Sequence, residues 1–259
     1  MSVLLEGGCR VSEMHEGVPI VAGTLAIWSQ VGRDGGAKAI SMKVIECGPG
    51  LSPALQNPDC DEVLFFLGES LQTDDSNTCT VFLDGQPHEL ESNSGVYLRP
   101  HQTITFDNPG SRPVYFVTSQ CPEPDGPLNW LPPLTESLGG PSSQKPVVRL
   151  SERRSLTTGD RWYRVLVDHE IGSEQVTQFV GSIPPGRAPD HFHEYEEVLF
   201  ILRGNGRMWA GETSTAIGPG SCINLPRRQV HCVENLGPGE LRLLGVFYPA
   251  GSPAVRYET

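Results

Sequence analysis

Apolar residues along this chain occur in short runs that end at turn residues. Residues 25–31, 176–183 and 241–248 are examples, each seven or eight residues long and rich in β-branched or aromatic side chains. Such runs predict β-strands, and the abundant Gly and Pro between them predict turns. Two further runs, Val63–Leu67 and Val198–Leu202, are apolar without a break, which predicts strands buried on both faces. The pattern therefore favours an all-β fold.

The chain contains an internal repeat. The sequence Asp61-Glu-Val-Leu-Phe-Phe-Leu is matched by Glu196-Glu-Val-Leu-Phe-Ile-Leu, and the similarity continues from Gly95–Pro100 and Asn108 to Gly220–Pro226 and Asn235. A repeat of this length indicates two copies of one structural unit. We predict an N-terminal domain over residues 1–121, a Pro/Gly/Ser-rich linker over 122–146 and a C-terminal domain over 147–259. Residues 1–38 are expected to form an extension that packs against a barrel and covers an edge strand.

The strongest chemical signal lies at the start of the second apolar run. His191, His193 and Glu197 are separated by even intervals, so in a strand their side chains would all project from one face. His231 begins another short apolar segment and is available as a fourth ligand from a neighbouring strand. Three imidazoles and one carboxylate form a donor set that suits a divalent transition metal.

These residues carry a resemblance to a known family. The spacing G-x4-H-x-H-x3-E-x6-G from Gly186 to Gly204, followed by G-x5-P-x4-H-x3-N from Gly220 to Asn235, is similar to the two motifs of the cupin superfamily. The first glycine stands one residue closer to the histidines than usual, which affects no ligand position. The resemblance implies two antiparallel jelly-roll barrels in tandem, a bicupin, with His191, His193, Glu197 and His231 as the metal ligands.

The N-terminal copy has lost these ligands. Aligning the repeats places Gln56 at the position of His191, Pro58 at that of His193 and Ile104 at that of His231, whereas Glu197 is matched by Glu62. One carboxylate is too few to hold a metal against water. We therefore expect one metal per chain, bound in the C-terminal barrel.

The metal and the reaction stay open at this stage. The resemblance favours Fe or Mn, and Ni, Cu and Zn suit the same ligands. It implies first a dioxygenase or other oxidoreductase acting on a small organic molecule chelated to the metal. A non-redox isomerase or decarboxylase, with the metal as a Lewis acid, is the alternative within catalysis. A non-catalytic small-molecule-binding protein is the alternative outside it. Glu197 is the expected catalytic ligand, because its charge would tune the metal.

Candidate pocket residues are more weakly indicated. Phe179, Tyr195 and Trp209 are expected to line the barrel mouth, and Arg187 or Arg207 to pair with a substrate carboxylate. Two cysteines near the second motif, 222 and 232, are read as small buried fillers, because no basic neighbour marks either as a thiolate.

The composition limits the classes of binding partner that we expect. A formal net charge of −12 disfavours nucleic acid and anionic membranes, which leaves a small molecule as the expected partner. The seven cysteines are odd in number and lack paired spacing, as in a reduced protein. The N-terminus lacks a leader pattern and no segment is apolar enough to span a membrane, so we expect a cytoplasmic protein. Cupin barrels commonly pair, and the resemblance implies a possible homodimer.

Overall fold

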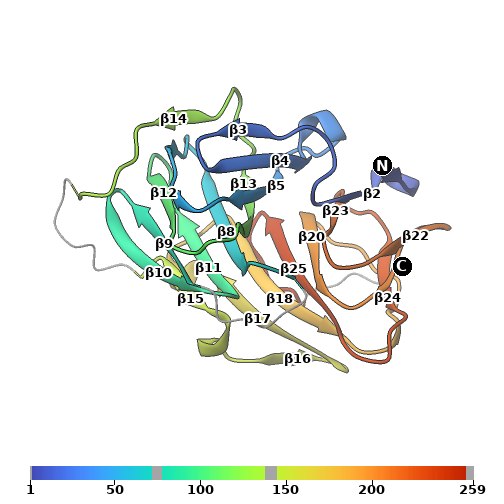
Figure 1. Ribbon diagram of the computed structural model, residues 1–259. Coiled ribbons are helices and arrows are strands. Elements are labelled where there is room, and N and C mark those ends of the chain that lie inside the picture. The colour runs from blue at the N-terminus through green and yellow to red at the C-terminus, as the bar shows by residue number, and fades with distance from the viewer. Residues whose placement is uncertain (1, 72–77, 138–144, 255–259) are drawn as a thin grey trace.

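The computed structural model describes residues 2–71, 78–137 and 145–254, and these form two β-barrels side by side (Figure 1). Nearly all regular structure is antiparallel strand. The predicted all-β, two-barrel fold is confirmed. The helical segments described are short 3-10 turns: η1 (Glu6–Gly8), η2 (Arg33–Gly35), η3 (Leu150–Glu152) and η4 (His169–Ile171). No helix in the described ranges is long and apolar enough to cross a membrane.

The N-terminal barrel is made of two facing sheets. One runs in the order β15-β11-β8-β13-β5-β4-β3, and the other in the order β10-β9-β12-β7-β14, with β6 also paired to β12. The strands that the N-terminal half contributes are β3 (Ile20–Ala22), β4 (Leu25–Val31), β5 (Met42–Cys47), β6 (Gly50–Leu51), β7 (Ala54–Gln56), β8 (Asp61–Gly68), β9 (Thr78–Leu83), β10 (Gln86–Glu91), β11 (Ser94–Leu98), β12 (Thr103–Asn108), β13 (Val114–Cys121) and β14 (Asn129–Leu131).

The C-terminal barrel repeats this plan. Its larger sheet runs in the order β1-β2-β23-β20-β25-β18-β17-β16, and its smaller sheet in the order β19-β24-β21-β22. The strands that the C-terminal half contributes are β16 (Leu156–Thr158), β17 (Arg161–Val167), β18 (Thr177–Ile183), β19 (Gly186–Arg187), β20 (Glu196–Arg203), β21 (Gly206–Ala210), β22 (Thr213–Ile217), β23 (Ser221–Leu225), β24 (His231–Asn235) and β25 (Leu241–Tyr248).

Each barrel receives strands from the other half of the chain. β1 (Val3–Leu4) and β2 (Arg10–Glu13) extend the C-terminal barrel, where β2 pairs with β23. β15 (Val147–Arg149), which follows the linker, pairs with β11 of the N-terminal barrel. The linker strand β14 also lies on the N-terminal barrel, against β7. Strand pairing therefore crosses the predicted domain boundaries at both ends, and it covers the edges of β23 and β11.

The two unbroken apolar runs lie at the centre of the molecule. On β20, Leu199 and Ile201 face the interior of the C-terminal barrel, whereas Val198 and Phe200 pack in a core shared by the two barrels. β8 divides its residues in the same way between the shared core and the interior of the N-terminal barrel. Side chains alternate faces along a strand, so a strand between two cores must be apolar throughout. This explains why the runs lack polar interruptions.

One buried carboxylate joins the barrels. Glu196 points out of the C-terminal barrel and accepts hydrogen bonds from the backbone N–H groups of Lys38, Ala39 and Ile40, at 2.8, 2.7 and 3.1 Å. These residues lead into β5 of the N-terminal barrel. Because side chains alternate, the next residue, Glu197, points into the C-terminal barrel. The carboxylate pair Glu196 and Glu197 therefore faces two different regions.

Candidate metal centre in the C-terminal barrel

The four predicted ligands come from three parts of the barrel. Glu197 lies on β20 and His231 begins β24, whereas His191 and His193 belong to the loop between β19 and β20. The expected continuous strand from His191 to Glu197 is therefore wrong, because β20 begins only at Glu196. An isolated bridge holds the loop instead, in which the backbone N–H groups of His191 and His231 each bond the other's carbonyl, at 3.1 and 2.9 Å.

The three imidazoles converge. His191, His193 and His231 each offer a ligand nitrogen, and these atoms all lie within 4.8 Å of one another. Their ring centroids are 4.6–5.3 Å apart. Glu197 is adjacent, with its Oε2 3.7 Å from Nε2 of His193. The arrangement matches the donor set of a divalent transition-metal site.

Backbone carbonyls set the tautomer of two of the imidazoles. Nδ1 of His191 lies 2.9 Å from the carbonyl oxygen of Pro189, and Nδ1 of His231 lies 2.8 Å from that of Gln229. A carbonyl oxygen only accepts, so each Nδ1 carries the proton and donates it. The lone pair of each ring is then on Nε2, as in most metal-bound histidines.

Burial shifts the pKa values at the site. It raises the pKa of Glu197 to about 8, and it lowers that of His231 to about 3 with help from the neighbouring His191. His231 is therefore neutral near pH 7, as a metal ligand must be. Burial disfavours the charged form of Glu197, and a cation beside it would offset that penalty. A bound divalent ion would be such a cation, so the residues fit a metal.

An aromatic stack supports the ligands from one side. The ring of His193 stacks on Tyr195, with centroids 4.6 Å apart and planes 10° apart. Tyr195 in turn stacks on Phe247 of β25, at 4.1 Å and 16°. Packing of this kind limits ring rotation and holds an imidazole in one orientation.

The ligands open into a cavity of about 100 Å³. Phe179 and Tyr195, both predicted to line the site, are part of its wall. Arg161, at the start of β17, also lines it and was not predicted. The full wall is Thr158, Arg161, Trp162, Tyr163, Phe179, Gly181, Ser182, Ile183, His191, His193, Tyr195, Glu197, Leu199, His231, Val233, Leu243 and Pro253.

The other predicted pocket residues lie outside this wall. Along β21, Gly206, Met208 and Ala210 are buried, so Arg207 and Trp209 project from the opposite face. Trp209 donates to Glu234 at 2.8 Å. The guanidinium of Arg187 lies 4.2 Å from the Trp209 ring centroid, and it also bonds Asp190. Arg187, Arg207 and Trp209 therefore form an outer cluster. This arrangement corrects the expectation that Trp209 lines the barrel mouth, and it places Arg187 and Arg207, the expected partners of a substrate carboxylate, outside the cavity wall.

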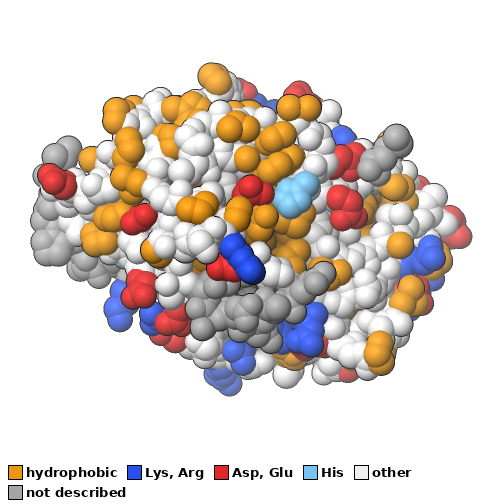
Figure 2. Space-filling model, viewed as in Figure 1, with side chains coloured by type: hydrophobic (Ala, Val, Ile, Leu, Met, Phe, Trp, Pro, Cys, Tyr) orange, Lys and Arg blue, Asp and Glu red, His pale blue; other side chains and the backbone are white. Residues whose placement is uncertain are grey.

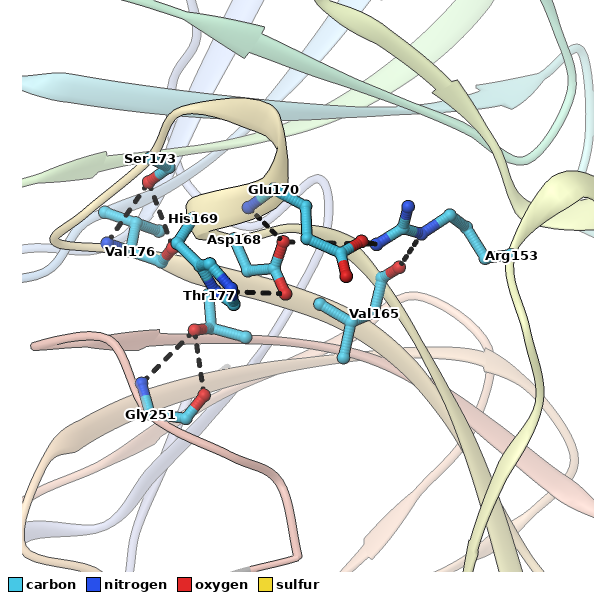
Figure 3. Close-up of polar contacts among 9 residues, drawn as sticks. All are labelled: Arg153, Val165, Asp168, His169, Glu170, Ser173, Val176, Thr177 and Gly251. Carbon is cyan, nitrogen blue, oxygen red and sulfur yellow. Dashed lines mark hydrogen bonds and ion pairs between the residues drawn. The ribbon is translucent and has the colours of Figure 1, made fainter.

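The segment after β25 reaches the cavity through Pro253. Thr177 on β18 holds this segment at Gly251, whose carbonyl accepts from the hydroxyl at 3.1 Å and whose N–H donates back at 3.2 Å. Figure 3 shows this double contact. The same view shows Arg153 bonding the carbonyl of Val165, at 2.6 Å, and the carboxylate of Glu170, at 2.8 Å. Side-chain contacts therefore anchor both the η4 loop and the segment that carries Pro253.

All seven cysteines are buried and unpaired by disulfides. Burial raises the pKa of the Cys232 thiol to about 11 and raises that of Cys222 well above its usual range. Thiols in such environments are protonated and unreactive near neutral pH. Cys222 is therefore the small apolar filler that the sequence suggested, whereas the sulfur of Cys232 accepts a hydrogen bond from Nε of Arg187 at 3.3 Å, a basic neighbour that the sequence did not reveal.

Strand register refines the comparison of the two repeats. Leu55 pairs with Ile104 on β12, as His191 is bridged to His231 on β24. Leu55 therefore occupies the place of His191, and the alignment that placed Gln56 there was wrong by one residue. Neither residue is a metal ligand of the imidazole type.

The other residue matches between the two repeats agree with the sequence alignment. The carbonyl of Pro58 accepts from the N–H of His101, just as that of His193 accepts from Arg228. His101 and Arg228 both have positive φ, at 66° and 62°. Among the residues that the structure describes, the group of side chains close enough to hold a metal is the His191, His193 and His231 cluster.

Comparison with known proteins agrees with this fold. Residues 179–247 match the family described as "Cupin domain". A solved structure of oxalate decarboxylase superposes with a TM-score of 0.74 at 12% identity, covering 93% of this chain and 77% of that one. A deletion mutant of the Bacillus subtilis oxalate decarboxylase gives 0.73 at 12% identity, covering 92% and 76%.

A second kind of protein has a similar structure. The putative glyoxylate-induced protein from Pseudomonas aeruginosa gives a TM-score of 0.70 at 16% identity, covering 96% of this chain and 91% of that one. No curated protein matches the sequence. The paired barrels, the matched domain and these superpositions together show that the chain has the bicupin fold of the cupin superfamily.

Proposed function

We propose that the C-terminal barrel binds one divalent transition metal through His191, His193, Glu197 and His231 and acts on a small organic acid. The observation that carries this proposal is the convergence of three imidazole nitrogens within 4.8 Å at a cavity that also exposes a carboxylate. Four protein ligands leave positions open on a five- or six-coordinate ion, as catalytic sites require. Fe and Mn are the metals that we favour.

The cavity wall supports a small acid as the substrate. Among the described residues that line it, Arg161 supplies the permanent positive charge. A guanidinium binds a carboxylate with two parallel hydrogen bonds, which fixes its orientation. Apolar neighbours such as Tyr163, Phe179 and Leu199 exclude water around that contact. A volume of about 100 Å³ limits the substrate to a few non-hydrogen atoms beyond those that meet the metal.

A decarboxylase or isomerase agrees better with the comparisons than the dioxygenase that the sequence favoured. Two of the similar structures are oxalate decarboxylases, and the likeness covers both barrels. The metal would supply Lewis acidity toward a chelated acid. The chain's own contribution is to orient the acid through Arg161 and to keep water out with Phe179, Tyr195 and Pro253.

The experiment is a paired assay of gas exchange. The protein is loaded with Mn²⁺ or Fe²⁺ and offered oxalate and small 2-oxo acids, and CO2 release and O2 uptake are recorded together. We expect CO2 release without net O2 consumption. Uptake of one O2 per turnover would replace this proposal with the dioxygenase. If the metal-loaded protein binds these acids but turns none over, it is a binding protein instead.

A further inference from the structure

The N-terminal barrel contains a larger cavity than the metal-binding one. Its volume is about 400 Å³, within the range of small-molecule sites, compared with about 100 Å³ in the C-terminal barrel. The wall includes Glu62, the counterpart of Glu197, together with Lys43, Thr118 and Gln120. The lost metal site is therefore not filled by side chains.

Strand register shows what has replaced the metal site. Glu62 on β8 pairs with Gln120 on β13, and Glu197 on β20 pairs with Phe247 on β25. Gln120 therefore stands where the C-terminal barrel has Phe247, the base of its aromatic stack. An amide at this position offers a donor and an acceptor in place of an apolar ring.

The neighbouring strand shows a second exchange. Lys43 on β5 pairs with Thr118, whereas Phe179 on β18 pairs with Gly245. The Phe179 ring covers Gly245 so closely that a Cβ added to that glycine would lie 2.3 Å from it. In the N-terminal barrel the same pair of positions is an ammonium and a hydroxyl. Two aromatic rings and a glycine in one barrel are thus replaced by three polar side chains that line a cavity in the other.

These polar groups form one connected network. Lys43 donates to the side-chain oxygen of Gln120, and the amide nitrogen of Gln120 lies 3.3 Å from Glu62 and 3.2 Å from Asn57. The Thr118 hydroxyl donates to Glu62 at 2.6 Å. Burial raises the pKa of Glu62, although Thr118 and Lys43 oppose the shift. Gln120 takes one of the three N–H donors of Lys43, so the ammonium retains donors for a further acceptor.

The rest of the wall combines an apolar interior surface with polar and acidic residues. Ile27, Ile45, Leu64, Ile104 and Phe106 form the interior surface. The apolar residues Val18 and Ile20 stand at the mouth and are 93% and 53% exposed. Figure 2 shows hydrophobic side chains gathered on the face that β3 and β14 border in Figure 1. The rim carries the carboxylates Asp34, Glu123 and Asp125.

We propose that this N-terminal cavity is a binding site for an uncharged small organic molecule with a carbonyl or amide group on an apolar body. Lys43 donates to the carbonyl oxygen, Glu62 and Gln120 meet the neighbouring polar atom, and the isoleucine walls cover the body. Four acidic side chains, Asp34, Glu62, Glu123 and Asp125, line the cavity against the one ammonium of Lys43, so a carboxylate ligand is disfavoured. The site does not depend on the metal or on the function proposed for the other barrel.

The test uses three isosteric probes on the full-length protein: benzamide, benzoate and benzamidinium. Isoleucine methyl groups are labelled for NMR, with Ile45 and Ile104 reporting on the cavity and Ile201 and Ile223 on the C-terminal core. We expect benzamide to shift the first pair saturably and to leave the second pair unchanged. Benzoate and benzamidinium should each bind at least about tenfold more weakly than benzamide. A tenfold change is about the effect of losing one hydrogen bond to a charged group.

Variants separate a binding site from a hydrated cavity. Lys43→Met keeps the length of the side chain and should weaken benzamide about tenfold, whereas Lys38→Met, at an exposed lysine outside the cavity, should not. Glu62→Gln provides a second variant if Lys43→Met fails to fold. The proposal is overturned if benzamide shifts no cavity methyl, if benzoate binds more tightly, or if every folded cavity variant binds benzamide like the wild type.

Discussion

Glu62 and Glu197 occupy the same register of the two barrels and differ in what surrounds them. Glu197 lies beside three imidazoles, whereas Glu62 accepts from Thr118 and Gln120 next to the ammonium of Lys43. Burial raises the pKa of both carboxyl groups. A buried carboxylate is stabilised by a neighbouring cation or by hydrogen-bond donors. The N-terminal barrel surrounds its carboxylate with Lys43, Thr118 and Gln120, whereas we propose that the C-terminal barrel binds a metal ion beside its own.

The largest expected effect is on the metal-binding side of this comparison. His193→Ala should lose both metal and turnover, because removing a ligand costs more than the roughly 10–100-fold typical of an outer-sphere partner. Glu197→Gln should keep a substantial fraction of the metal and lose most turnover, since the charge tunes the ion more than it holds it. Metal content and activity are measured on the same samples. Unchanged turnover in Glu197→Gln at equal metal loading would contradict this role.

The second prediction concerns Arg161, the cation of the C-terminal cavity. Arg161→Met should raise KM for a carboxylate substrate about tenfold or more and change kcat less, because a bidentate ion pair is lost. Arg207→Met is the matched control, since Arg207 faces outward toward Ser214 and should leave KM unchanged. Steady-state kinetics on the active acid provide the measurement. If Arg207→Met raised KM more than Arg161→Met did, the substrate would bind at the outer cluster instead of in the cavity.

The third prediction tests the contact between the barrels. Glu196→Ala leaves three backbone donors without their partner and should lower the free energy of unfolding by about 1–3 kcal/mol. Glu194→Ala removes a carboxylate that pairs with Arg227 and Arg228 at the surface and should lower the free energy of unfolding less than Glu196→Ala does. Urea unfolding distinguishes the two. Equal effects would mean that the Glu196 contact does not couple the barrels.

The last effect, small for each pH unit, is a pH dependence of the metal-free protein. Between the ordinary pKa of 4.5 and the folded value of about 8, Glu197 keeps a proton that the unfolded chain has released. Stability of the metal-free protein therefore falls as pH rises through this window, and Glu197→Gln lacks the loss. We expect the melting temperature of the variant to gain a few degrees on that of the wild type for each pH unit from pH 5 to pH 8, because one pKa unit is about 1.4 kcal/mol and 1 kcal/mol is about 2–4 °C. If the melting temperatures of the variant and the wild type changed in parallel with pH, the charge of Glu197 would already be compensated in the metal-free protein.

The sequence predicted the fold and the convergence of the three histidines because both follow from local signals. Unbroken apolar runs mark strands between two cores, and the ligand spacing needs no knowledge of the loop that carries His191. Strand register was harder to predict. The N-terminal copy has one more residue between Leu55 and Glu62 than the C-terminal copy has between His191 and Glu197, so Leu55 rather than Gln56 matches His191. No pattern in the chain indicated that β2 would join the distant β23.

Side-chain direction explains the remaining differences. Trp209 and Arg207 belong to the outward set of β21, which the short run Arg207-Met-Trp did not reveal. Arg161 reaches the cavity because β17 pairs with β18, a contact far from both motifs. The polar set of Lys43, Thr118 and Gln120 becomes visible only when three strands are aligned against their counterparts. Signals of this kind depend on the register of the sheet rather than on the order of residues.

Metal stoichiometry tests the difference between the barrels most directly. The protein is purified without added metal, loaded with Mn²⁺ or Fe²⁺, and compared with His231→Ala and Glu62→Gln by elemental analysis. We predict about one metal per chain in the wild type and in Glu62→Gln, and almost none in His231→Ala. A value near two, or a loss of metal in Glu62→Gln, would contradict the assignment of the metal to the C-terminal barrel alone.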